Sequence, residues 1–190
     1  MAATVRTRKS KASGETTREK LARAALAEFN AHGFDGTDTN KIARRAGFAP
    51  QTFYRWFADK TEIFLFVYRR WEEEEGALIA ELRRKRTPAA DMAEAIVAHH
   101  RATLKFRRSL RQLSVDNDDV RAARAQSRRR QIARILEWNP KSISTAEALA
   151  PILLQSERLC DALAEGELKD MEVTEDAARR ELATLLKRLR

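Results

Sequence analysis

The sequence predicts an all-α protein with a three-helix N-terminal domain, a larger helical domain and about nine helices in total. The first observation is composition: the 190 residues include only 6 glycines and 4 prolines among many Ala, Leu, Arg and Glu, which favour helices. The second is pattern, because apolar residues recur every three or four positions and seldom alternate. The length suffices for two domains, and we place the segments at residues 1–14, 15–62 and 63–190.

The charge of the chain is strongly basic and concentrated near the N-terminus. Net charge is +9, and residues 1–60 hold 12 Lys and Arg against 6 Asp and Glu. A basic surplus fits a polyanionic partner, although a surface charged for solubility remains an alternative. The single cysteine, Cys160, excludes an intramolecular disulfide framework and a cysteine zinc cluster. No apolar stretch suits a membrane span or a secretory signal, so we expect a cytoplasmic protein.

Residues 1–14 are predicted to form a flexible basic arm, because they are polar and lack a helical period. Arg6, Arg8, Lys9 and Lys11 could contact a phosphate backbone or a minor groove. A tail without a role is an equally open interpretation.

The first helix is predicted to begin at a capping box and end at a glycine. Thr16 and Glu19 have the spacing at which each side chain accepts from the other residue's backbone N–H. Gly33 follows the apolar stripe that includes Phe29, where a left-handed residue ends a helix. We expect this helix to support the two that follow.

Two short helical patterns meet across an Ala-Gly turn between residues 38 and 57. Thr37 or Asp38 can cap the first pattern, Gly47 can end it, and Pro50 suits the first position of the second. Phe48 and Phe53 have the spacing of a hydrophobic staple. This arrangement predicts a helix-turn-helix.

The second short helix has two unlike faces. Phe53 and Phe57, four residues apart, should turn inward. The other face carries Gln51, Thr52, Tyr54 and Arg55; Gln can pair with adenine and Arg with guanine, whereas hydroxyl groups suit phosphates. From the residues alone, a small helical hairpin with a solvated polar face is an equal alternative.

Residues 15–65 resemble the N-terminal domain of TetR-family transcriptional regulators. The matching positions are Phe34 and Thr37; Ile42, Ala43, Ala46 and Gly47; Thr52, Phe53, Tyr54 and Phe57; and Lys60 and Glu62. Two positions depart from the usual pattern. Ala49 replaces a common Ser or Thr cap, at a cost of about 1 kcal/mol, and Trp56 stands where His or Tyr is frequent.

The resemblance implies a DNA-binding domain at residues 15–62 and a ligand-binding and dimerisation domain at residues 63–190. It implies DNA contacts from the start of the second helix, from the third helix and from the residue that opens the fourth. The candidates are Thr37, Thr39, Asn40, Arg44, Pro50, Gln51, Thr52, Tyr54, Arg55, Trp56 and Lys60.

The second segment is predicted to contain six further helices. A cap at Asp59 opens a long helix limited by Pro88, and further helices cover residues 89–106, 107–114, 119–137, 145–165 and 174–189. Residues 72–75, a run of four glutamates, are interpreted as a solvated face. A row of arginines between residues 121 and 134 is interpreted as salt-bridged, with an acidic effector or partner surface as the alternative.

Candidate pocket residues come from the fourth and fifth helices. They are Phe66, Met92, Ile96, His99 and Thr103. His99 and His100 point about 100° apart on a helix and have no third ligand at i+4, so we expect no metal and no cofactor.

The last two long helices are strongly amphipathic. Their stripes could cover their own domain, but the resemblance suggests a four-helix bundle with a second chain. The interface candidates are Leu149, Ile152, Leu153, Leu159, Leu163, Leu182, Leu185 and Leu189.

The leading hypothesis is a sequence-specific DNA-binding regulator, a homodimeric repressor released from its double-stranded operator by a small-molecule effector. The alternative is a nonspecific or architectural DNA-binding protein without an effector. We expect no enzyme, because no paired-acid, Cys-His or glycine-rich phosphate motif is present.

Overall fold

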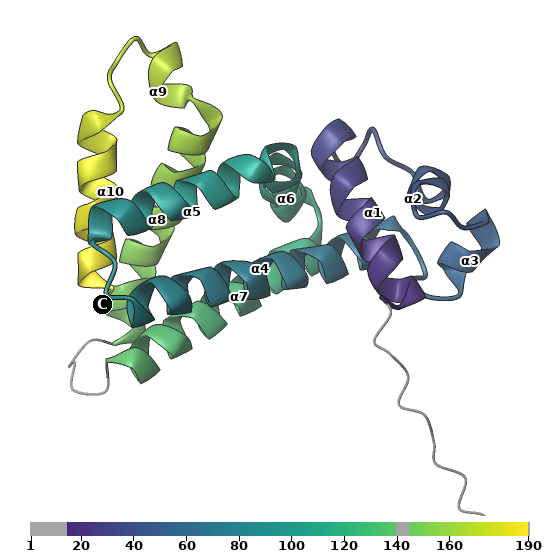
Figure 1. Cartoon of the computed structure of the whole chain (residues 1–190), viewed down its shortest axis with the longest axis horizontal. Coiled ribbons are helices and arrows are strands. Elements are labelled where there is room, and N and C mark those ends of the chain that lie inside the picture. The colour runs from purple at the N-terminus through teal and green to yellow at the C-terminus, as the bar shows by residue number, and fades with distance from the viewer. Residues whose placement is uncertain (1–14, 140–144, 190) are drawn as a thin grey trace, which may run out of the picture.

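The computed structural model describes residues 15–139 and 145–189, and in these ranges it contains ten helices and no strand. Figure 1 shows α1 to α3 at one end of the molecule and α4 extending from them alongside α7 to the other end. The helices are α1 (Thr17–His32), α2 (Thr39–Arg45), α3 (Pro50–Tyr54), α4 (Lys60–Arg84), α5 (Ala89–Ala102), α6 (Leu104–Asp116), α7 (Asp118–Trp138), α8 (Ala146–Glu165), α9 (Glu167–Asp170) and α10 (Asp176–Arg188). The all-α prediction is confirmed.

Three helices begin at side-chain caps that the sequence indicated. Thr16 and Glu19 form the predicted capping box, in which the Thr16 N–H donates to Glu19 Oε2 at 2.8 Å and the Glu19 N–H donates to Thr16 Oγ1 at 3.2 Å. Asp38 caps α2 and Asp59 caps α4, each accepting a backbone N–H three residues on at 2.8 Å. These bonds satisfy N–H groups that the first helical turn leaves unpaired.

Aromatic side chains fill the core between α1, α3, α4 and α6. The Phe29 and Phe64 rings meet edge to face at 5.1 Å, and the Phe64 and Phe106 rings lie 5.0 Å apart. The rings of Phe53 and Phe57, with centres 5.8 Å apart, complete the core on the side of α3. All five are at most 1% exposed. Because Phe106 belongs to α6, the larger set of helices is packed directly onto the N-terminal three.

The two helices predicted over residues 89–106 and 107–114 are present as α5 and α6, but the break between them lies earlier, at Thr103. Thr103 has φ −126° and ψ 36°, outside the helical region. Its Oγ1 accepts a hydrogen bond from Trp71 Nε1 at 2.9 Å, which ties the break to α4. Apolar spacing continues through Thr103, so periodicity alone placed the break a few residues too late. The break lets α6 lie against α1.

Helices α5, α8 and α10 pack against one another at the end of the molecule opposite α3. Gly166, with φ 80°, ends α8 as predicted, and the short α9 after it was not predicted. Among the residues that the structure describes, no helix is both long and apolar enough to cross a membrane.

The dimer candidates are core residues of the chain itself. Leu149, Ile152, Leu153, Leu163, Leu182, Leu185 and Leu189 are 0–8% exposed in the single chain, and Leu159 is partly buried. An apolar stripe shows that a helix buries one face, and here that face packs within its own chain. A second chain resting on α8 would instead meet outward residues such as Leu154, which is 46% exposed.

Candidate nucleic-acid interface and ligand cavity

Gly47 forms the turn between α2 and α3. Its φ of 79° lies in the left-handed region, which side chains disfavour. Pro50 occupies the first turn of α3, as predicted, and Ala49 before it supplies no side-chain cap. The turn therefore depends on the glycine and on the partly buried Phe48 packed against the core.

The short helix α3 separates apolar from polar side chains as the sequence predicts. Phe53 is fully buried, while Gln51, Tyr54 and Arg55 are exposed. Trp56, just beyond the helix, is 44% exposed. The exposed side chains are long donors and acceptors of the kind that contacts base edges and phosphates. They depend on the aromatic core for their orientation and have solvent in front of them.

The start of α2 shares this surface with α3. Thr39 Oγ1 and Tyr54 Oη are 3.0 Å apart, so one hydroxyl donates to the other across the two helices. Asn40 and Arg44 are exposed on α2, whereas the exposed Arg45 is paired with Glu28 at 2.9 Å. The predicted contacts from the basic arm fall in residues 1–14, outside the described residues.

Two candidates for DNA contact have other surroundings in the structure. Thr37 is 2% exposed, and its Oγ1 is buried without a hydrogen-bond partner. Lys60 Nζ donates to the carbonyl oxygens of Phe34 at 2.8 Å and Thr37 at 3.0 Å, and it lies 4.0 Å from the centre of the Phe34 ring. Lys60 thus fastens α4 to the loop that leads into α2. Sequence spacing could not show this, because those carbonyls lie 23 and 26 residues earlier.

A cavity of about 90 Å³ lies between α4, α5, α7, α8 and α10. One part of its wall is apolar and includes Ile79, Met92, Ile96, Ile135, Trp138 and Leu186. The polar part includes Glu75, Arg83, His100, Gln131, Arg134 and Glu157. An apolar wall with a few polar groups is the usual composition of a small-molecule site.

Of the five predicted pocket residues, Met92 and Ile96 line this cavity, and Phe66, His99 and Thr103 do not. Phe66 packs on the N-terminal core, with its ring 5.5 Å from that of Phe57. His99 stacks on Trp71 at 4.9 Å, and the Thr103 hydroxyl is bound to the same indole. Its neighbour His100 lines the cavity instead, because helix geometry turns the two histidines to different sides.

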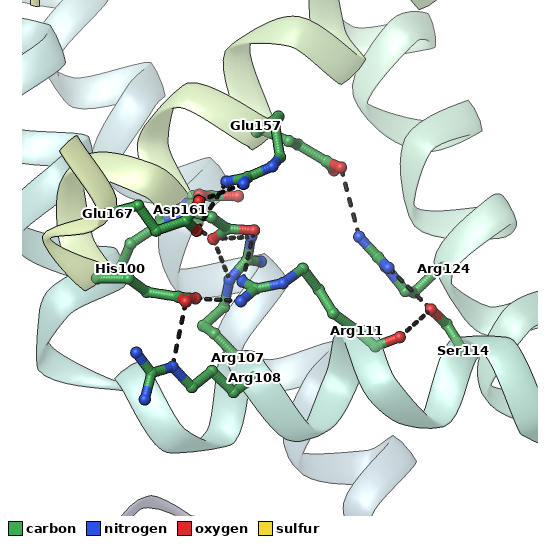
Figure 2. A network of polar contacts seen from close by, with 12 residues as sticks. His100, Arg107, Arg108, Arg111, Ser114, Arg124, Glu157, Asp161 and Glu167 are labelled. Carbon is green, nitrogen blue, oxygen red and sulfur yellow. Dashed lines mark hydrogen bonds and ion pairs between the residues drawn. The ribbon is translucent and has the colours of Figure 1, made fainter. Parts of the chain in front are cut away.

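Buried charges connect the cavity wall to α6. His100 lies between two carboxylates, with Nε2 2.8 Å from Glu75 Oε1 and Nδ1 3.0 Å from Asp161 Oδ1. Asp161 also pairs with Arg107 and Arg111, both at 2.9 Å. Figure 2 shows these α6 arginines converging on Asp161 of α8. Charges this deeply buried are tolerated because each has an opposite partner.

The protonation states follow from these contacts. Burial and Arg107 lower the pKa of His100, but its hydrogen bonds to Asp161 and Glu75 outweigh them and hold that pKa above the ordinary value. Burial raises the pKa of Asp161, but the His100 hydrogen bond and the Arg107 charge hold it well below its usual range. An imidazolium that donates to both carboxylates fits both directions.

The glutamates of residues 72–75 are not a uniformly solvated face, which corrects that interpretation. Glu72 is 3% exposed and Glu75 8%, while Glu73 and Glu74 are exposed. The signal was present in the spacing, because residues three apart share a helix face. The negative charge of the glutamates suggested that they face solvent. The cations that allow Glu72 and Glu75 to be buried, Arg130 and His100, lie on other helices and cannot be identified from this run of residues.

The arginines of α7 are largely engaged in ion pairs. Arg128 contacts Glu157 of α8 at 2.7 Å, and Arg124 contacts the same carboxylate at 3.6 Å. Arg130 pairs with Glu72 of α4 through two nitrogens. The salt-bridged interpretation therefore holds for these three side chains. Within the described residues, no group of three or more His, Cys, Asp and Glu has a metal-binding arrangement.

Helix α6 also contacts the N-terminal unit by hydrogen bonds. Ser109 Oγ accepts from the backbone N–H of Phe34 at 3.0 Å, and Lys105 Nζ donates to the carbonyl of Ala31 at 2.7 Å. Both residues flank Arg107 along the helix. Helix α6 therefore makes two kinds of contact. Arg107 and Arg111 take part in the buried ion pairs, whereas Lys105 and Ser109 bind the C-terminal end of α1 and the residue that follows it.

Comparison with known proteins agrees with this geometry. Residues 21–67 match the family described as "Bacterial regulatory proteins, tetR family". A curated relative, the uncharacterized HTH-type transcriptional regulator YdgC of Bacillus subtilis (strain 168), is 37% identical over 54 residues. That match spans 28% of this chain and 28% of the relative.

Solved structures resemble nearly the whole chain. A structure from Rhodococcus sp., assigned to the TetR family, has a TM-score of 0.68 at 17% identity and covers 91% of this chain and 97% of its own. GusR of Salmonella enterica has a TM-score of 0.63 at 19% identity, and the match covers 90% of this chain and 95% of GusR. The fatty acid degradation regulator FadR of Bacillus halodurans has a TM-score of 0.57 at 17% identity, and the match covers 93% of this chain and 96% of FadR. At these identities the likeness shows a shared fold.

Proposed function

Because the chain belongs to the TetR family of bacterial regulatory proteins, we propose that it is a homodimeric repressor that binds a palindromic operator and leaves it when a small molecule fills the cavity. The single observation that carries the DNA-binding part is the surface of α3. Gln51, Tyr54 and Arg55 are exposed above a fully buried Phe53. Such a helix end can enter a major groove and read base edges.

Specific reading is proposed for Gln51 and Arg55, with Tyr54 and Thr39 at the phosphates. Pro50, Thr52, Asn40, Arg44 and Trp56 surround them and complete the proposed contact surface. Lys60 supports this surface from behind through the carbonyls of Phe34 and Thr37. The surplus of basic residues in this part of the chain favours approach to DNA.

Dimerisation is proposed through the outward faces of α8 and α10. Two α3 helices about one turn of DNA apart, roughly 34 Å or a multiple of it, would then meet two half-sites. The exposed Leu154 of α8 supports this face as an apolar contact.

Release by an effector is supported by the route from cavity to reading surface. Glu75 and His100 line the cavity, His100 contacts Asp161, and Asp161 contacts Arg107 of α6. A ligand that binds one arrangement of this route more tightly than another shifts the population toward that arrangement. Helix α6 would carry the shift to α1 through Ser109 and Lys105.

Selection from a random duplex library at moderate salt tests the proposal. We expect one enriched palindrome, bound by two chains, with half-sites separated by whole helical turns. Equal binding of all duplexes, with affinity set only by salt, would instead identify the second candidate, a nonspecific DNA-binding protein, which the net charge of +9 favours.

A further inference from the structure

The guanidinium of Arg134, in α7, lies against Gly76 of α4 in the cavity wall. A Cβ on Gly76 of α4 would fall on Arg134 Nη1, so the guanidinium lies where another residue would have its side chain. Glycine inside a helix is destabilising relative to alanine. Gly76 therefore makes room on α4 for this cation, and both residues line the cavity.

The carboxylate nearest Arg134 is already paired with another arginine. Arg130 donates through two nitrogens to both oxygens of Glu72, whereas Arg134 Nη2 reaches the same carboxylate only at 3.4 Å. Two guanidinium groups thus share one negative charge. A guanidinium has five N–H donors in a fixed fork, so Arg134 keeps the capacity to bind a second anion.

The two carboxylates that line the cavity, Glu75 and Glu157, are also neutralised. Glu75 is bound by His100 at 2.8 Å, and Glu157 is bound by Arg128 at 2.7 Å. Arg130 and Arg134 carry two positive charges against the single negative charge of Glu72, so positive charge is in excess around Arg134.

From this geometry we propose that the cavity binds a small amphipathic carboxylate. The carboxylate pairs with Arg134, and the apolar body lies against Met92, Ile96 and Leu186. The inference rests on the proposed function in one respect: it gives the chemical class of the effector for the cavity assigned there.

Isothermal titration calorimetry on the full chain with three eight-carbon probes tests the proposal: octanoate, octanol and octylammonium. We expect octanoate to bind at least about tenfold more tightly than octanol, because a hydrogen bond to a charged group contributes about 1.5–3 kcal/mol. Octylammonium should bind most weakly. Equal affinities for octanoate and octanol, tighter binding of octylammonium, or no binding of any probe would each overturn the proposal.

Variants of α7 separate a specific pair from a general effect of charge. Arg134→Gln should weaken octanoate about tenfold and leave octanol unchanged; Glu72 keeps Arg130, so the fold should persist. The matched control is Arg129→Gln, which removes one exposed positive charge of the same helix outside the cavity wall. Equal effects of the two variants on octanoate would contradict the pairing.

Duplex selection in the absence of probe keeps the two proposals distinguishable. Octanoate binding that depends on Arg134, with no enriched duplex, would remove the proposed function and retain the anion site. An enriched duplex whose binding protein ignores octanoate would do the reverse.

Discussion

The end of the molecule around α3 is held by aromatic side chains, whereas the middle, where α4, α5, α6 and α8 meet, buries ionised groups. At the first end, Phe29, Phe53 and Phe57 are at most 1% exposed. In the middle, Arg107 and Asp161 are 4% and 3% exposed and depend on each other's charge. The first arrangement fixes a surface and changes little with conditions. The second can be rearranged by a competing charge or a proton, as the proposed release by an effector requires.

The largest expected effect is on the buried charges. Asp161→Ala leaves His100, Arg107 and Arg111 without their shared carboxylate, and breaking such a buried pair costs about 3–5 kcal/mol. Urea unfolding at pH 7 measures the loss. The control is Asp170→Ala, which changes an exposed residue of α9. A loss below about 1 kcal/mol for Asp161→Ala would mean that the charges do not hold this region together.

The pH dependence of His100 gives the next effect. Its pKa is raised in the folded chain, so its contribution is fully present below the unfolded value of 6.5 and is lost as pH rises through the folded pKa. Groups around it include Glu75, Asp161 and Arg107. His100→Gln should therefore destabilise the protein more at pH 6 than at pH 9, by about 1–3 kcal/mol at the lower pH. Unfolding curves across this range would refute the prediction if the loss were constant or grew with pH.

Lys60 tests the boundary between the two regions. Lys60→Met removes two hydrogen bonds to the loop before α2 and should cost about 1–2 kcal/mol in unfolding free energy without any DNA present. Lys20→Met, at an exposed position of α1, serves as the control and should change little. An unchanged free energy of unfolding for Lys60→Met would contradict this structural role and leave only the predicted phosphate contact for Lys60.

The smallest effect concerns the uncapped start of α3. Ala49→Ser supplies a side-chain oxygen for an unpaired N–H and should stabilise the protein by about 1 kcal/mol. Thermal unfolding would record this as a higher midpoint. A lower midpoint would show that the serine does not adopt the capping geometry.

The two regions also differ in how far the sequence predicts them. Caps such as Thr16, Asp38 and Asp59, and the glycine turn at Gly47, act within a few residues, so their patterns are visible in the chain. The contacts of His100 join residues 25 and 61 positions apart, which no local pattern reports.

The dimer candidates were chosen from a pattern that has a related limit, and in the single chain most of them are buried. A stripe of leucines predicts that one face of a helix is buried, but it does not indicate whether the same chain or a second chain covers that face. The separation of α5 from α6 at Thr103 depends in turn on the indole of Trp71, 32 residues away.

The measurement that tests the account most directly is the affinity of wild type and Arg55→Ala for the selected duplex and all its single-base variants. If α3 reads DNA, Arg55→Ala should lose about 1–3 kcal/mol of discrimination at one base pair in each half-site and little elsewhere. A uniform loss over every duplex, or no loss at all, would contradict the assignment of this surface as the reader.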